Sequence, residues 1–435
     1  MRSSLSPDAV AGGTLSSDFL ASIAVNEERG LPEIIETKNV PILLYAKRSE
    51  VEADAIKQLV ALAESPLPVG YVAAMPDVHV GKGVTIGTVF ASAKYVAPMA
   101  VGVDIGCGMC AVPFDGLYKD SLSKKELRKI QQLIKERIPT GFDMHKTPLQ
   151  GAQETIQDIS NKTAPSRYLE ESMTAPKVLK QLGSLGGGNH FLEVVYDESG
   201  RVWIMLHSGS RNIGNITATH YDKLAKEELI QRGIQTPHNL NYLELESEEG
   251  QQYLQDMLWC QEYAWHNRSF MRDLMIDIVE DVTKGSVALD ESVNIHHNFC
   301  QCERCNYTDP KTGAKVEADL YVTRKGATPA APGQMGLIPG SMGTGSYVTR
   351  GRGNSGSWSS CSHGAGRRMS RTAAKKVISQ ADFERAMEGI VCDTNVSVRD
   401  EAPQAYKNLN EVMKNQADLV EVVTRLKPLV NVKGF

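Results

Sequence analysis

Residues 183–214 read GSLGGGNHFLEVVYDESGRVWIMLHSGSRNIG, and this stretch carries the clearest fold signal of the chain. Its apolar and β-branched runs at Phe191–Tyr196 and Val202–Leu206 predict two strands. Each strand adjoins a glycine-rich loop, and the two loops hold His190 and His207. Glycine permits positive φ and close approach of the backbone, so loops of this kind suit a phosphate group or a tightly folded site.

Four further glycine-rich loops stand between predicted elements and also contain polar side chains. They are GKG (81–83), VGVDIGCGM (101–109), PGSMGTGS (339–346) and SHGAGRR (362–368). Tight turns alone are the alternative interpretation. Six loops that combine glycine with polar residues favour a shared functional site.

The rest of the chain mixes helical and strand patterns without a regular order. The predicted elements are helices at 51–65, 124–138, 217–233 and 247–284 and strands at 84–93 and 318–324. Their spacing shows neither the period of a barrel nor an internal repeat. We therefore predict an α+β (mixed α/β) fold with a sheet-lined cleft. Residues 1–38, rich in Ser, Ala and Gly, are expected to be a flexible N-terminal extension.

The composition excludes several classes of protein. The chain has 435 residues, of which 41% are hydrophobic and 23% charged, unlike a disordered or collagen-like chain. The longest apolar stretch, 96–112, is interrupted by Asp104 and by glycines, so it cannot span a bilayer. The N-terminus lacks the apolar region of a secretory signal, so a cytoplasmic location is expected. Eight cysteines in this length predict reduced thiols rather than a disulfide scaffold.

Basic residues are concentrated late in the chain. Residues 321–376 contain nine Lys or Arg and no Asp or Glu, although the average composition would place about seven acidic residues there. A segment of this kind predicts a positive surface that attracts a polyanion. A solvated basic face without a function is the alternative interpretation.

Carboxylate, thiol and imidazole groups gather in the glycine-rich loops. Asp104 and Cys107 are three residues apart, and His207 ends a predicted strand, so all three can converge on one ion. The neighbours His296 and His297 point to opposite faces of an extended segment, so one of them is expected to bind. These ligand types bind first-row transition metals, and Zn, Mn and Fe all remain open.

A second group of thiols stands in CQCERC, which places Cys300, Cys302 and Cys305 close together in sequence. The spacing resembles half of a zinc site, but no fourth ligand follows at a suitable distance along the chain. A loop of free thiols is the alternative interpretation.

Ten sequence blocks, in order, resemble the motifs of the RtcB family of RNA ligases. The blocks are MPDVHVGKG, VGVDIGCGM, GSLGGGNHFLEV, MLHSGSRNIG, NIHHNF, YVTRKGA, IPGSMG, SCSHGAGRRMSR, DEAPQAYKN and the final VKG. The resemblance implies one large RtcB-like catalytic domain at 39–435, with a two-metal site in its cleft. The extension 1–38 and residues 300–317 have no counterpart in the family pattern, and 300–317 are expected to be an insertion loop.

The resemblance implies an enzyme that joins an RNA 3′-phosphate or 2′,3′-cyclic phosphate end to a 5′-hydroxyl end. Enzymes of this family use GTP and two Mn²⁺ ions, form a covalent histidine–GMP intermediate, and activate the RNA end as RNA-3′-pp-5′-G. On this chain the implied nucleophile is His363, and Asp77 is implied to orient its imidazole. RNA repair or tRNA splicing is the implied role, with a monomer expected and an activating protein partner left open.

The resemblance also assigns ligands to the metals and to the substrates. The implied metal ligands are Asp104, Cys107, His190, His207 and His297. The implied GTP-binding residues are Asn189, His190, Phe191, Leu192, Glu193, His297, Asn298, Pro339, Gly340, Ser341, Met342, Ser346, His363, Gly364, Ala365, Gly366 and Lys433. The implied contacts to RNA phosphate are Arg211, Lys325, Arg367 and Arg371.

Two other functions are compatible with the same residues. A metal-dependent phosphoesterase would open cyclic phosphate ends with a metal-bound hydroxide, need no GTP and survive the loss of His363. A non-catalytic RNA-binding protein would bind RNA independently of Cys107 and of metal. Neither function needs a nucleophilic histidine in a phosphate-binding loop, so the ligase is the preferred hypothesis.

Overall fold

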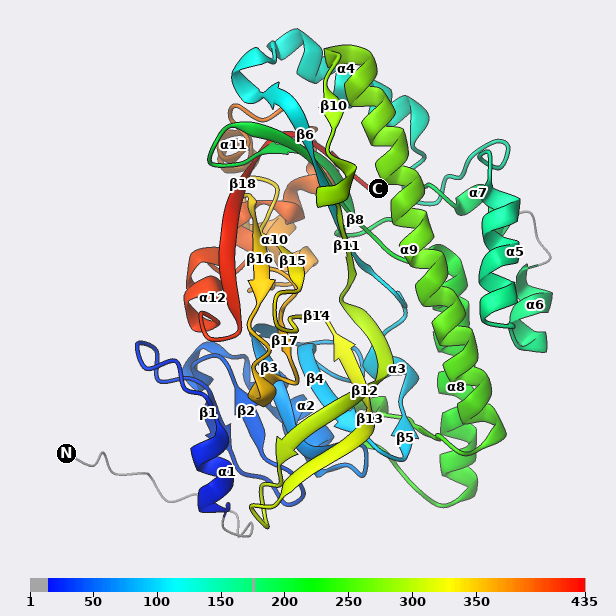
Figure 1. Cartoon of the computed structure of the whole chain (residues 1–435), viewed down its shortest axis with the longest axis vertical. Helices are drawn as coiled ribbons and strands as arrows, with labels where there is room; N and C mark the ends of the chain where they lie inside the picture. Colours follow the sequence, from blue (N-terminus) through cyan, green and yellow to red (C-terminus); the bar gives the residue numbers. More distant parts are fainter. Residues whose placement is uncertain (1–14, 174–176, 435) are drawn as a thin grey trace.

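Two β-sheets form the body of the protein, and helices pack around them (Figure 1). The computed structural model describes residues 15–173 and 177–434. A six-stranded sheet lies in the lower half of Figure 1, and an eight-stranded sheet lies in the upper half. Helices and strands alternate irregularly along the chain, which confirms the predicted mixed α+β class.

The six-stranded sheet has the strand order β1, β2, β3, β4, β13, β12. Its strands are β1 (Glu33–Ile35), β2 (Ile42–Leu44), β3 (Val69–His79), β4 (Ile86–Ser92), β12 (Asn298–Thr308) and β13 (Lys315–Lys325). β2 and β3 pair in parallel, and the other neighbours are antiparallel. The C-terminal end of β3 carries Asp77, which belongs to the candidate site described below.

The eight-stranded sheet has the order β10, β6, β8, β7, β18, β16, β15, and β11 also pairs with β6. Its strands are β6 (Gly108–Tyr118), β7 (Phe191–Tyr196), β8 (Arg201–Ser208), β10 (Ser286–Val287), β11 (Val293–His296), β15 (Met335–Pro339), β16 (Ser346–Gly351) and β18 (Val420–Lys433). Two small antiparallel pairs complete the strands: β5 (Tyr95–Val96) with β9 (Leu243–Glu244), and β14 (Ala327–Pro329) with β17 (Ser360–Ser362).

The stretch 183–214 forms the centre of the eight-stranded sheet. β7 and β8 make an antiparallel hairpin, and the Asp197 carboxylate accepts the backbone N–H bonds that close its turn. Phe191 pairs with His207 in this register. The hairpin therefore brings the glycine-rich loop before β7 and the one after β8 to the same end of the sheet.

Helices pack around the sheets and account for the predicted helical segments. They are α1 (Ser17–Ser22), α2 (Ala53–Glu64), α3 (Pro98–Val101), α4 (Lys124–Arg137), α5 (Ala152–Lys162), α6 (Arg167–Met173), α7 (Lys177–Gln181), α8 (Arg211–Gln231), α9 (Glu248–Thr283), α10 (Arg371–Val377), α11 (Gln380–Ala386) and α12 (Leu409–Asn415). α8 begins six residues before the predicted start because Gly214, inside the helix, hides the helical pattern. None of the described helices has the length and hydropathy that a bilayer crossing requires.

α9 is the longest helix, and its 36 residues correspond to about 54 Å. Ser247 caps its N-terminus, and Lys284 ends it in the left-handed conformation. The helix packs against α4, α8, β6 and β8 and runs along one side of the molecule (Figure 1). Its buried face includes two polar residues, Asn267 and Arg268, which reach the functional site.

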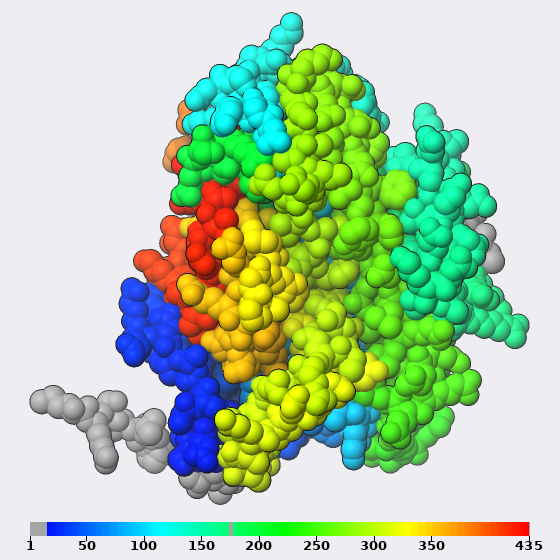
Figure 2. Space-filling view, viewed as in Figure 1, coloured from blue at the N-terminus to red at the C-terminus, as the bar shows by residue number. Residues whose placement is uncertain are grey.

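Residues 300–317 form paired strands at both ends rather than the expected loop. β12 and β13 keep a continuous register from Asn298 opposite Lys325 to Thr308 opposite Lys315, which leaves a short turn between them. Figure 2 shows this hairpin across the lower front of the molecule, next to α1. One face of its outer half packs Cys305 and Leu320 against the core, and the other face carries exposed polar residues. The predicted strand at 318–324 lies in β13, whereas β12 was expected to be a loop.

Residues 15–38 also differ from the expected flexible extension, whereas residues 1–14 lie outside the described part of the chain. Phe19 on α1 is 1% exposed, and its ring centroid lies 5.9 Å from that of Tyr71 in the core. β1 adds an edge strand to the six-stranded sheet. Few apolar residues anchor this segment, so it shows no periodic signal in the sequence.

Candidate active site

All five predicted metal ligands meet at the end of the β7–β8 hairpin. Cys107 Sγ lies 3.3 Å from His190 Nε2 and 3.2 Å from His207 Nε2. His207 Nε2 is 3.2 Å from His297 Nε2, and Asp104 Oδ2 is 2.9 Å from His190 Nε2. One thiol, three imidazoles and one carboxylate, from four separate segments, thus form one continuous cluster.

The chemistry of this cluster fits a metal ion. Burial holds the pKa of His207 and of His297 well below the ordinary value, so both rings are neutral and carry a lone pair. The buried Nδ1 atoms of His190 and His297 have no hydrogen-bond partner among the described residues. Cys107, His190 and His207 are close enough to share one ion. Nitrogen, sulfur and oxygen donors that converge in this way suit a first-row transition metal.

Two polar residues of α9 hold the loops that carry these ligands. Asn267 Oδ1 accepts a 2.8 Å hydrogen bond from the Gly183 N–H, in the loop before β7. Arg268 Nη1 donates to two backbone carbonyls at 2.7 and 3.0 Å, one directly before Cys107 and the other directly after His207. One buried helix therefore fixes three ligand-bearing segments relative to one another.

The neighbours His296 and His297 point to opposite sides of the chain. His297 faces the metal-binding cluster through Nε2. His296 faces α9 instead, with Nδ1 3.0 Å from Arg268 Nη2. The structure thus brings one of the two histidines into the cluster and gives the other a structural contact, as expected for neighbours in an extended segment.

Asp77 holds the imidazole of His363 at the edge of a cavity. Asp77 Oδ2 accepts a 2.7 Å hydrogen bond from His363 Nδ1 and also accepts the backbone N–H groups of His363 and Gly364, each at 3.2 Å. A proton held on Nδ1 leaves the lone pair on Nε2. The His363 ring centroid is 4.9 Å from that of His297, so this pair lies beside the metal-binding cluster.

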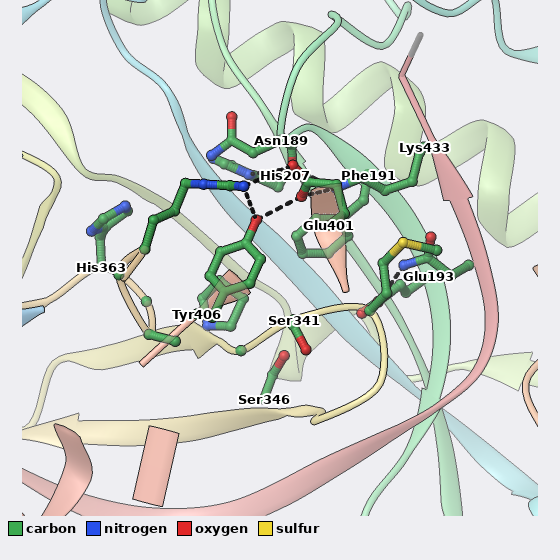
Figure 3. Close-up of a pocket in the computed structure, with 18 of the residues that line it drawn as sticks. Asn189, Phe191, Glu193, His207, Ser341, Ser346, His363, Glu401, Tyr406 and Lys433 are labelled. Carbon is green, nitrogen blue, oxygen red and sulfur yellow. Dashed lines mark hydrogen bonds and ion pairs between the residues drawn. The ribbon is translucent and has the colours of Figure 1, made fainter. Parts of the chain in front are cut away.

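The cavity next to His363 has a volume of about 270 Å³ (Figure 3). Most predicted GTP-binding residues line it: Asn189, Phe191, Glu193, Pro339, Gly340, Ser341, Met342, Ser346, His363, Gly364, Ala365, Gly366 and Lys433. They come from β7 and the loop before it, from β15, β16 and the loop between them, from β18, and from the loop after β17. The predicted sheet-lined cleft is therefore present, and its lining combines apolar side chains with charged groups such as Glu193 and Lys433.

Four predicted GTP-binding residues do not line this cavity. His190 and His297 belong to the metal-binding cluster. Leu192 is completely buried in the core under α4, because successive strand residues face opposite sides and both of its neighbours face the cavity. Asn298 Oδ1 accepts the Gly326 N–H at 2.8 Å and so braces the backbone behind His363.

Glu401 joins the basic side chains of the cavity, and the sequence analysis assigned it no role. Its carboxylate lies 2.9 Å from Lys433 Nζ, 2.9 Å from Arg371 Nη1 and 3.2 Å from Arg367 Nη1. Burial alone would raise the pKa of Glu401, but the charges of Lys433 and Arg371 outweigh it and lower the pKa to about 2. The cations of the cavity therefore already share an internal anion (Figure 3).

The four residues predicted to contact RNA phosphate have different surroundings. Arg367 and Arg371 line the cavity. Arg211 begins α8 with a left-handed φ of 58°, a strained conformation of the kind found at functional sites. Lys325 is buried, and its ammonium group donates to the carbonyl oxygens of Lys82 and Met99. Burial lowers the pKa of Lys325 to about 7, so this residue does not present a free cation to a substrate.

Several residues at the site escaped the sequence analysis. Those that line the cavity or brace the ligand loops are His79, Asn267, Arg268, Glu401, Tyr406 and Asn431. His79, Glu401 and Tyr406 stand inside the blocks MPDVHVGKG and DEAPQAYKN, so a sequence signal existed for them. Asn267 and Arg268 lie within a long helix that offers no local signal, because their partners are far away in sequence.

The three thiols of CQCERC do not converge. Cys300 and Cys305 are buried in two different core clusters, and Cys302 is exposed. Among the described residues, the metal-compatible group is Cys107 with His190 and His207. The structure therefore favours free thiols over a zinc site in this segment.

The fold and the site together have features of an enzyme with a metal-compatible site. A His–Cys–Asp cluster, a carboxylate-held histidine and a cavity rimmed by arginines lie within one mixed α+β body. These are the parts that phosphoryl transfer requires: a nucleophile, a site for cations and donors for phosphate oxygens.

The chain belongs to the RtcB family. The sequence pattern of this family, described as "tRNA-splicing ligase RtcB", matches residues 58–434. The RNA-splicing ligase RtcB of Escherichia coli (strain K12) is 40% identical over 418 residues, which cover 92% of this chain and 99% of the relative. The tRNA-splicing ligase RtcB of Thermococcus kodakarensis is 30% identical, with 93% of this chain and 97% of the relative covered. The RNA-splicing ligase RtcB of Mycobacterium tuberculosis is 31% identical, with coverages of 87% and 100%.

Proposed function

We propose that this protein is a GTP-dependent RNA ligase that joins 3′-phosphate or 2′,3′-cyclic phosphate ends to 5′-hydroxyl ends, in RNA repair or tRNA splicing. One observation carries the proposal. The Asp77–His363 pair lies between the metal-compatible cluster and the cavity lined by Glu193, Arg367, Arg371 and Lys433. The relatives named RNA-splicing ligase RtcB support the same activity.

The proposed metal site holds two Mn²⁺ ions. Its ligands are Asp104, Cys107, His190, His207 and His297, with Cys107 central because its sulfur is near two of the histidines. When bound, such ions offset the negative charge on phosphoryl oxygens and on the leaving group. His297 places that charge beside His363.

His363 performs the first chemical step. Its Nε2 attacks the α-phosphorus of GTP, so that an N–P bond forms and the bond to pyrophosphate breaks. Asp77 keeps the proton on Nδ1 and stabilises the positive charge that develops on the ring. The GMP group then passes to the RNA 3′-phosphate to give RNA-3′-pp-5′-G, and the 5′-hydroxyl displaces GMP as the RNA strands join.

The cavity provides recognition of the nucleotide. The carboxylate of Glu193 lines it and accepts a 2.6 Å hydrogen bond from Asn431 Nδ2, which leaves acceptor positions for the N–H donors of guanine. Lys433 Nζ donates to the Asn189 carbonyl at 3.1 Å and lies over the ring of Phe191, so it links the C-terminal strand to the loop before β7. Arg367 and Arg371 supply planar donors for phosphate oxygens at the rim.

The proposal is tested with labelled GTP. We expect purified protein with Mn²⁺ to acquire an acid-labile label from GTP labelled at the α-phosphate and none from GTP labelled at the γ-phosphate. In the same tubes, RNA with a 2′,3′-cyclic phosphate should join to RNA with a 5′-hydroxyl, with GTP and not with ATP. Joining without a protein–GMP adduct would contradict the histidine route, and opening of the cyclic end without joining would favour a phosphoesterase.

The affinity for GTP is expected to fall as the pH falls through neutrality. Burial raises the pKa of Glu193 to about 7, and the protonated carboxyl cannot accept both guanine donors. Because binding requires the carboxylate, the apparent Kd should rise about tenfold for each pH unit below 7. Calorimetric titration with GTP at pH 6, 7 and 8 measures this effect.

Glu193→Gln provides the control for that pH series. The variant lacks the titrating carboxyl, so its Kd for GTP should be higher at pH 8 and change only with the titration of the nucleotide phosphate. Equal pH dependence in the wild type and the variant would contradict the assignment of Glu193.

A further inference from the structure

Phe142 is the most exposed of the large hydrophobic side chains in the described part of the chain, with 98% of its surface accessible. A phenylalanine left in water forgoes about 2 kcal/mol of burial free energy. Its neighbours at 143, 146 and 147 are polar and exposed, whereas Met144 and Leu149 are partly buried, so Phe142 is the one large hydrophobic side chain of this described loop that is fully exposed. An isolated aromatic ring of this kind is unlike the centre of a protein–protein interface, which is a cluster of apolar residues.

The loop that carries Phe142 is held firmly in place. Asp143 N–H donates to the Thr140 carbonyl at 3.0 Å and closes the turn. Arg211 Nη2 donates to the carbonyls on both sides of the phenylalanine, at 2.8 Å to Gly141 and 3.2 Å to Asp143. The backbone is therefore fixed by a guanidinium group while the aromatic ring itself is free.

The same loop lies against the glycine-rich segment that leads to the metal-binding cluster. A Cβ atom at Gly187 would meet only Gly141 Cα, at 3.9 Å. A Cβ atom at Gly186 would lie 3.0 Å from Arg211 Nη1 and would collide with the ring of His190, and one at Gly188 would lie 3.6 Å from Arg371 Nη2. A strip without side chains thus connects the cluster, two arginines and the Phe142 loop.

We propose that Phe142 is a stacking platform for an unpaired nucleobase of the RNA strand whose backbone passes Arg211. This inference rests on the proposed function and deepens it by assigning a base-binding site. Single-stranded RNA is recognised by aromatic rings that stack on its bases, combined with cationic groups along the backbone. The glycine strip lets the RNA strand approach backbone amides closely. Because the Phe142 loop is already fixed by Arg211, binding does not cost the conformational entropy of ordering that loop.

Fluorescence anisotropy with single-stranded RNA that ends in a 3′-phosphate tests the proposal. Phe142→Ala is expected to weaken binding about 5- to 150-fold, the range that corresponds to one base–aromatic stack. Phe142→Trp and Phe142→Tyr should restore binding, whereas Phe142→Leu, which keeps apolar surface without a ring, should not. Ile230→Ala, at a 61% exposed apolar residue on α8, is the matched control and should bind as the wild type does. Because Phe142 is exposed, none of these variants should change the unfolding temperature.

A series of RNAs with one abasic nucleotide identifies the stacked base. One of the abasic RNAs should bind the wild type as weakly as intact RNA binds Phe142→Ala. The affinity of that same abasic RNA for Phe142→Ala should be no lower than its affinity for the wild type. If Phe142→Ala binds intact RNA as well as wild type, or if every abasic position weakens both proteins equally, the stacking site is overturned. Failure of the wild type to form the GMP adduct would instead overturn the proposed function, so the two failures are distinguishable.

Discussion

His363→Ala is expected to form no protein–GMP adduct and to join RNA at least about 10⁴-fold more slowly than wild type. The reason is that the substitution removes the proposed nucleophile, Nε2 of the ring held by Asp77. Radiolabelled GTP and gel analysis of the RNA products measure both effects. Preactivated RNA-3′-pp-5′-G should bypass the defect, because its joining does not require a new adduct.

His238→Asn is the control for that experiment. His238 is exposed, lies away from the cavity and has a left-handed backbone that asparagine tolerates. It should label with GTP and join RNA at the wild-type rate. A normal adduct on His363→Ala would show that another side chain is the nucleophile.

Cys107→Ser is expected to lower the affinity for Mn²⁺ by more than about 100-fold and to lower RNA joining in parallel. Loss of a residue that merely orients a ligand costs about 10- to 100-fold in metal affinity, so the loss of a central ligand should cost more. The Cys107 sulfur contacts two of the ligand histidines, so its replacement affects the whole cluster. Calorimetry or paramagnetic resonance of bound Mn²⁺ measures the affinity independently of activity.

Cys302→Ser provides the matched control, because Cys302 is an exposed thiol on β12 outside the metal-binding cluster. It should bind Mn²⁺ and join RNA as wild type does. An unchanged metal affinity in Cys107→Ser would remove the thiol from the proposed ligand set.

Local sequence patterns predicted most of the regular structure. The β7–β8 hairpin follows from two apolar runs, and α4 and α9 follow from their helical spacing. Of the β12–β13 hairpin, the sequence predicted the strand at 318–324, whereas β12 was missed because CQCERC was interpreted as an insertion loop. The ordered segment at 15–38 was missed because its position depends on a few contacts, such as that of Phe19 with Tyr71.

The candidate site was predictable where its residues stand in the blocks that resemble the RtcB motifs. The metal-binding cluster and the Asp77–His363 pair are of this kind, and the structure brings their members together. Arg268 was not predictable, since its carbonyl partners lie about 60 and 160 residues away along the chain. The burial of Lys325 could not be predicted from the sequence either, because a local excess of basic residues does not indicate which of them are buried in the fold.

Acidic residues from other segments neutralise part of the positive charge of the basic stretch 321–376. Arg324 is buried and pairs with Glu303, while Arg371 pairs with Asp400 and Glu401. The stretch has no acids of its own, yet the fold supplies them. The positive surface expected from the sequence is therefore smaller than its nine basic residues suggest.

Glu401 acts as a resident counterion for the cavity. A phosphate group that binds Arg367 or Arg371 must compete with this carboxylate, which already neutralises part of their charge. The pairing with Glu401 also holds the side chains of Arg367 and Arg371 in place at the cavity. RNA affinity at this site should accordingly depend less steeply on ionic strength than the number of nearby cations implies.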